Sequence, residues 1–149
     1  MATDHQTTAE KGRRLAAREL RDRGATVSEL RQGNRVVLEA RNPRNGEVFH
    51  LRVKTRTAGT WQGSTRDGDP DPAPREPAAF WIFVDLQDAE HPGFYVAPDD
   101  WTRRDIHRAH QQYLSRHGGE RAIAKDSDHH AIEPRRVLQW RGRWDLLGL

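Results

Sequence analysis

A chain of 149 residues has the length of one domain, and its lack of cysteine excludes disulfide bonds, cysteine-ligated zinc and thiol nucleophiles. Hydrophobic residues make up 34%, no apolar run could cross a membrane, and the polar N-terminal sequence lacks an export signal, so we expect a cytoplasmic protein without a membrane partner. Basic residues number 25 against 22 acidic ones, and the net charge of +3 permits a nucleic-acid partner without requiring it.

The first half of the chain predicts one helix followed by a three-stranded meander. Residues 1–8 are polar and predict a flexible start, and residues 9–23 carry their apolar side chains on one helical stripe. Gly24 predicts the end of this helix. Runs of β-branched and apolar residues predict strands at 25–30, 34–40 and 47–56, with an Asn-Gly turn before the third.

The second half predicts a long loop, two more strands and two helices. Glycine and proline recur through residues 57–79, which predicts a loop, and the continuous apolar run at 80–84 predicts a strand covered on both faces. The other predicted elements are a strand at 93–97, a helix from 98 to 117, a polar loop at 119–133 and a helix at 134–147. Together they predict an α/β fold, a small mixed sheet flanked by helices, with residues 9–149 as one domain.

The third predicted strand ends in the residues Arg-Val-Lys-Thr-Arg, at 52–56, after a helix and a hairpin. This order resembles the PD-(D/E)XK nuclease superfamily, most of all its Holliday-junction-resolvase-like and restriction-endonuclease-like members, over residues 9–110. The resemblance implies a restriction-endonuclease-like core of helix, three-strand meander, long loop, two strands and helices. It also implies a helix glutamate, here Glu10, a strand aspartate and an acid-x-lysine pair that hold a divalent metal beside an activated water.

Two positions depart from the pattern that the resemblance implies. The strand aspartate is expected near Val37 and the acid of the acid-x-lysine pair at Arg52, and neither side chain offers a carboxylate oxygen. Residues i and i+2 share one face of a strand, so we expect Arg52 and Lys54 to point the same way. Glu39 is then expected to face one of them as an internal counter-charge. We therefore expect no catalytic residues, no metal and no other cofactor.

These residues lead to the main hypothesis, a catalytically degenerate nuclease-like domain that binds nucleic acid, DNA in the first place, or a partner protein. Only three of the 25 basic residues are lysine, so the chain is rich in arginine, whose guanidinium binds phosphate with two hydrogen bonds. The predicted nucleic-acid contacts are Arg52, Lys54, Arg56 and Trp61. Trp61 would stack on a base or, alternatively, anchor its loop on the core.

Two other functions stay open. The first is an active endonuclease that uses magnesium or manganese with non-standard acids, Glu10 and Glu39, and places Lys54 at the water. The second is a protein-interaction or dimerisation module without nucleic-acid binding, which would use the tryptophan-rich C-terminal segment.

The histidines allow a further interpretation. Helical spacing places His107 and His110 on one side of the predicted helix, with Asp105 nearby, and further histidines follow at 117, 129 and 130. Such residues can bind zinc, but no His-Glu-x-x-His pattern is present. Surface or hydrogen-bonding histidines are therefore the preferred interpretation.

Overall fold

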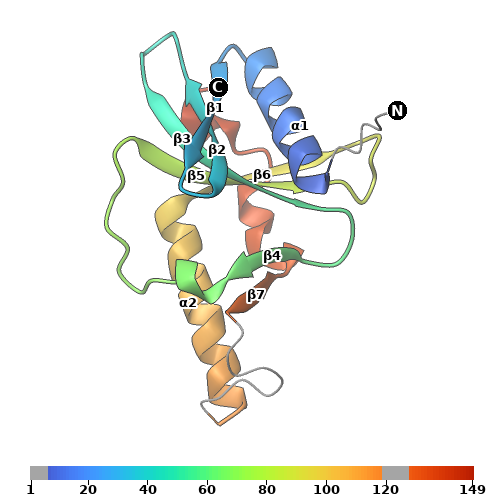
Figure 1. The fold of residues 1–149 in the computed structure, drawn as a ribbon, viewed down its shortest axis with the longest axis vertical. Coiled ribbons are helices and arrows are strands. Elements are labelled where there is room, and N and C mark those ends of the chain that lie inside the picture. Colours follow the sequence, from blue (N-terminus) through green and yellow to red (C-terminus); the bar gives the residue numbers. More distant parts are fainter. Residues whose placement is uncertain (1–6, 119–127) are drawn as a thin grey trace.

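The computed structural model describes residues 7–118 and 128–149, which are built around a five-stranded mixed sheet (Figure 1). The strand order is β1-β2-β3-β5-β6, and the predicted α/β class is confirmed. β3 and β5 run parallel, whereas the other neighbouring pairs are antiparallel. The strands are β1 (Thr26–Gln32), β2 (Arg35–Arg41), β3 (Val48–Arg56), β5 (Ala78–Asp85) and β6 (Gly93–Pro98).

α1 (Thr8–Asp22) packs on one face of this sheet, which confirms the first predicted helix. The Thr7 hydroxyl caps it by accepting a hydrogen bond from the Glu10 amide at 3.1 Å. Gly24, with φ at 103°, takes the left-handed conformation that follows the helix. The core between α1 and the sheet includes Ala16, Leu20, Leu38, Leu51, Ile82 and Val84. Of the predicted flexible start, residues 1–6 lie outside the described residues.

α2 (Asp99–Arg116) lies on the opposite face, together with a small second sheet (Figure 1). In that sheet β4 (Trp61–Ser64) pairs antiparallel with β7 (His129–Ile132). The core on this side includes Trp61, Trp81, Phe83, Tyr95, Ile106, Ile132 and Val137. Alternate residues of β5 enter the two cores, so the apolar run at 80–84 is covered on both faces, as predicted.

The prediction of an unbroken loop at 57–79 is wrong. This stretch contains β4 and the 3₁₀ helix η1 (Thr65–Asp67). The partner strand β7 lies in the segment predicted as loop at 119–133, of which residues 119–127 are outside the described ones. Both strands have only four residues, too few for an alternating pattern to stand out, and each is formed by its partner from a distant part of the chain.

The prediction of one helix at 134–147 is also wrong. Two 3₁₀ helices, η2 (Pro134–Trp140) and η3 (Trp144–Leu147), take its place. Between them Gly142 has φ at 64°, and its N–H donates to the Phe94 carbonyl of β6 at 2.9 Å. This bond to the sheet edge redirects the chain, so η2 and η3 reach the two different cores.

The remaining predicted elements are confirmed, with ends that differ by one or two residues. They are the strands of the meander, the strand at 93–97 and the helix from 98 to 117. Within the described ranges, no helix has the length and the apolar character needed to cross a membrane.

Candidate functional site

β3 divides its side chains between the two faces of the sheet. Leu51 is buried in the core under α1. Arg52 and Lys54 therefore point to the α2 side, where they lie beside Trp81 and Phe83 of β5 in the strand register. The two basic residues share one face, as strand geometry predicts.

The Arg52 guanidinium is held by an acid and an aromatic ring. Its Nη1 and Nη2 donate to the two carboxylate oxygens of Asp67 at 2.9 and 3.3 Å, and its central carbon lies 3.9 Å from the centre of the Trp81 ring. Burial lowers the pKa of Arg52, and the bonds to Asp67 oppose that shift. The prediction that Glu39 balances Arg52 or Lys54 is wrong, because Asp67 of η1 occupies that place.

Lys54 is an unbalanced cation on this face. Its ammonium makes no hydrogen bond or ion pair with any residue of 7–118 or 128–149. Burial lowers the pKa of Lys54, and the charges of Arg52 and Arg35 lower it further, while Asp67 acts in the opposite direction. Arg35, at the start of β2, is exposed and also has no ion pair among the described residues. Of these three cations, Arg52 alone is paired with an acid by a hydrogen bond.

A pocket of about 350 Å³ opens beside Arg52. It lies among the end of β1, the strands β2 and β3, residues 75–77 before β5, and the start of α2. Its basic and hydrogen-bonding residues include Gln32, Arg35, His50, Arg52 and Arg75, and its apolar ones are Val37, Pro77 and Ala79. Its acids are Glu76 and Asp99, which the three arginines outnumber. This composition suits an anionic ligand that also has an apolar part.

Asp99 is the buried acid of this pocket, and its carboxylate is already engaged. One oxygen accepts a hydrogen bond from Trp81 Nε1 at 2.8 Å, and the other accepts one from Arg75 Nε at 2.9 Å. Arg103 lies 3.6 Å from the second oxygen. Asp99 therefore positions the Trp81 ring on which Arg52 lies. Because Arg52 is paired with Asp67, Arg35 is the one arginine of the pocket without an ion pair among the described residues.

The two carboxylates considered for an active nuclease lie on opposite sides of the sheet. Glu39 pairs with its cross-strand neighbour His50, with 3.0 Å between Oε2 and Nε2. Glu10 lies on the α1 side, in a groove whose lining includes Leu38. The structure does not bring Glu10 and Glu39 together at Lys54.

The residues around Lys54 do not fit the divalent metal that the resemblance implies. Val37 lies in the pocket wall beside Arg52, where the strand aspartate was expected, and both oxygens of Asp67 are bonded to Arg52. Among the residues described, no three His, Asp or Glu side chains are placed to hold a metal ion. Cations and N–H donors dominate instead, and these groups bind anions.

Arg56 and Trp61, the other predicted contacts, belong to the packed interior. Trp61 is fully buried, and its Nε1 donates to the Val84 carbonyl at 2.9 Å. Arg56 lies over this ring, 5.1 Å from the ring centre, and bonds Asp85 at 2.8 Å. The two side chains fasten β4 to the end of β5, and the Trp61 ring has no exposed face on which a base could stack.

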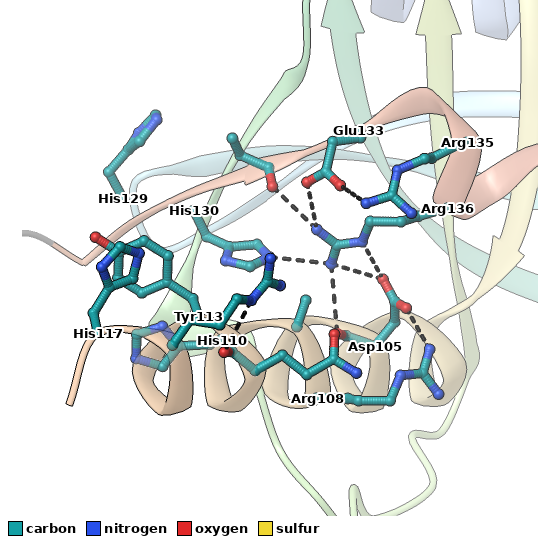
Figure 2. A pocket seen from close by; sticks show the side chains of 14 residues that line it. Asp105, Arg108, His110, Tyr113, His117, His129, His130, Glu133, Arg135 and Arg136 are labelled. Carbon is teal, nitrogen blue, oxygen red and sulfur yellow. Dashed lines mark hydrogen bonds and ion pairs between the residues drawn. The ribbon is translucent and has the colours of Figure 1, made fainter. Parts of the chain in front are cut away.

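A second pocket, of about 550 Å³, lies between the C-terminal half of α2 and the β7–η2 segment (Figure 2). Arg136 crosses its wall and contacts Asp105 at 2.7 Å and His130 Nε2 at 3.1 Å. Burial and then the charge of Arg136 lower the pKa of His130 to about 4, so His130 is neutral at pH 7.

This second pocket gathers most of the histidines considered for zinc. Its lining includes His110, His117, His129 and His130, whereas His107 does not line it. The Asp105 carboxylate is bound by Arg108 at 2.6 Å as well as by Arg136. Asp105, the one acid considered as a zinc ligand, is therefore already bound by two arginines.

The tryptophans of the C-terminal segment pack within the chain. Trp144 is buried against Phe94, with 5.6 Å between ring centres, and Trp140 meets Trp101 edge to face at 5.3 Å. In the described part of the chain, Leu138 is the one exposed large hydrophobic residue. An isolated exposed leucine is ordinary for a protein surface.

Sequence reasoning missed Arg35 and Arg75 in the first pocket and Asp67, which pairs with Arg52 beside it. Strand register is the signal that could have found Arg35, because pairing of Leu38 with Leu51 places it near Lys54 across the β2–β3 ladder. Asp67 and Arg75 come from the stretch predicted as loop. No local sequence pattern predicts where a connection of that length will place these two side chains.

Comparisons with family models, with curated proteins and with solved structures give no match to this chain. The proposed function therefore depends on the residues and the geometry of the site. It consists of three cations, one engaged acid and an adjoining pocket.

Proposed function

We propose that this chain is a catalytically degenerate, nuclease-like domain that binds nucleic acid, DNA in the first place, through the face of β3 that carries Arg52 and Lys54. The observation that carries the proposal is the Lys54 ammonium, which has no partner among the described residues and lies near Arg52 and Arg35. Repulsion within such a cluster is relieved when phosphate oxygens bind it.

The order of elements supports a restriction-endonuclease-like core. A helix, a three-strand meander, a long connection and two further strands follow one another along the chain. β3, which ends in the basic residues, is the central strand of the sheet. This order agrees with the one that the PD-(D/E)XK resemblance implies, but a fold alone does not carry a function, so the proposal depends on the basic face.

The same residues favour binding over hydrolysis. Metal-dependent cleavage needs free carboxylate oxygens to hold the metal and lower the pKa of a water. Val37 and Arg52 stand where the resemblance expects two of those carboxylates, and Arg52 engages both oxygens of Asp67. Lys54 would contact a phosphate oxygen and leave the phosphodiester bond intact.

Fluorescence anisotropy with labelled duplex DNA, single-stranded DNA and RNA, over a series of salt concentrations, tests the proposal. We expect the affinity to fall steeply with salt, and Lys54→Ala to weaken binding and lower the log–log salt slope by about 1. Arg18→Ala is the matched control, because it removes an exposed arginine of α1 on the opposite side of the sheet. This control should bind like the unaltered protein.

Two results would contradict the proposal. The first is no binding to any of the three nucleic acids at low salt, and the second is an equal effect of Lys54→Ala and Arg18→Ala. Incubation of the same substrates with magnesium or manganese tests the loss of catalysis separately. Cleavage that disappears in Glu39→Ala would establish the active endonuclease instead.

A further inference from the structure

The pocket beside Arg52 has walls on several sides, which an open basic face lacks, and walls can select one ligand over another. The geometry points to a subsite for one nucleotide unit that carries a phosphate monoester, at the end of a strand or in a free mononucleotide. Arg35 would bind the phosphate first, and Arg52 would add the second N–H of each Nη, because one N–H of each is used by Asp67. This inference rests on the proposed function, because the same cations are used, and it specifies which part of a nucleic acid is held.

The size and the walls of the pocket favour one unit over a continuous backbone. Its volume of about 350 Å³ lies at the lower end of the usual range for small-ligand sites, about 300–1,000 Å³. Residues from β1, β2, β3, β5, α2 and the 75–77 segment surround it. Paired strands need an open surface, whereas a strand end can enter from one side.

Three arginines against the two acids Glu76 and Asp99 give the pocket an excess of positive charge, which favours a monoester over a diester. A phosphate monoester carries about −1.5 to −2 charges at pH 7, whereas each diester of a strand carries −1. Arg35 has no ion pair among the described residues, and Lys54, outside the pocket lining, adds positive charge near Arg52. Arg75 lies at the rim with a side chain 55% exposed, and it donates only its Nε to Asp99. Its remaining N–H groups are available to a second phosphate oxygen.

The other side chains of the pocket suit the sugar or base of the same unit. Val37, Pro77 and Ala79 provide apolar contact, which inorganic phosphate does not need. Gln32 and Glu76 bring an amide and a carboxylate, which can bond the hydroxyl and amino groups of a nucleotide. A phosphate group joined to an apolar ring matches this combination.

A set of oligonucleotides that differ only at their ends tests the inference. One sequence is prepared with a 5′-phosphate, with a 3′-phosphate and with hydroxyl groups at both ends, and AMP and inorganic phosphate serve as competitors. We expect one phosphorylated form to bind about tenfold tighter than the hydroxyl form, and AMP to compete better than inorganic phosphate. Arg35→Ala should abolish this preference and Arg18→Ala should retain it, with circular dichroism confirming that both variants are folded.

The outcomes separate this inference from the proposed function. Equal affinity for all three ends, with Lys54→Ala still weakening each of them, overturns the subsite and leaves nucleic-acid binding in place. A preference that survives Arg35→Ala, or inorganic phosphate that competes as well as AMP, also overturns it. Binding of AMP without binding of any strand supports the subsite and contradicts the proposed function.

Discussion

Asp67 and Arg52 face each other with both carboxylate oxygens on one guanidinium, at 2.9 and 3.3 Å. The acid comes from η1, outside the strand that carries the basic residues. A carboxylate that binds arginine with two oxygens has the geometry that a phosphate group would use. Under the proposed function, Asp67 would therefore be an internal stand-in for the phosphate at Arg52.

Asp67→Asn removes the negative charge and keeps the size of the side chain. We expect this variant to bind DNA several-fold tighter, because Arg52 and Lys54 lose their competing anion. It should also be less stable by about 1–2 kcal/mol, since the side chain of Arg52, 15% exposed, loses its ionic partner. Anisotropy and urea denaturation measure the two effects. Weaker DNA binding by a folded Asp67→Asn protein would contradict the stand-in role.

Trp61→Phe separates an anchoring role from a role in stacking on a base. The change removes the hydrogen bond to the buried Val84 carbonyl and part of the packing against Phe83 and Tyr95. We expect a loss of about 2 kcal/mol of stability and an unchanged affinity for DNA below the unfolding transition. A clear loss of affinity at unchanged stability would restore Trp61 as a nucleic-acid contact.

His130 makes the stability depend on pH. Its pKa falls from 6.5 to about 4 on folding, through burial and then Arg136, so the unfolded chain takes up the proton first as the pH drops. Its contribution is complete above pH 6.5 and is lost as the pH falls toward 4, with about 1–2 kcal/mol gone at pH 5.

Urea denaturation at pH 7 and pH 5 checks this expectation. The difference in stability between the two pH values should shrink in His130→Gln. His91→Gln, at an exposed histidine, is the control and should keep the original difference. Equal pH dependence in both variants would show that His130 does not cause it.

Gly12→Ala tests the contact between α1 and β3. A Cβ at position 12 would overlap the Thr55 hydroxyl, which lies on the strand that carries Lys54. We expect a loss of about 1–3 kcal/mol from overpacking, measured by urea denaturation. Adding Thr55→Ala should recover part of this loss, because it removes the hydroxyl and one methyl group. Unaltered stability of Gly12→Ala would mean that α1 shifts freely on the sheet.

The sequence predicted the elements that depend on local chemistry. Thr7 and Gly24 mark the ends of α1 by capping and by left-handed φ, which are properties of those residue types. The apolar run at 80–84 predicted a strand covered on both faces, and residues 81–84 are buried accordingly. The three-stranded meander was predictable from its turn residues and its β-branched residues.

The parts that sequence reasoning missed depend on distant partners. β4 forms because it pairs with β7. The break between η2 and η3 depends on the hydrogen bond from the Gly142 N–H to the Phe94 carbonyl. In the candidate site, the shared face of Arg52 and Lys54 was predictable from strand periodicity. The pairing of Arg52 with Asp67 was not, because a connection of many residues can place an acid in many positions.

The last elements of the fold affect how the protein can be made. Ile132 and Val137 enter the core under α2, whereas Trp144 and Leu147 enter the core under α1. A nascent chain that has reached residue 118 already has all five strands of the main sheet, yet each face of that sheet still lacks some of its covering side chains. The two cores are therefore complete only after residues 128–149 have been made, and until then each face, though covered in part by α1 or α2, exposes apolar side chains to chaperones or to aggregation.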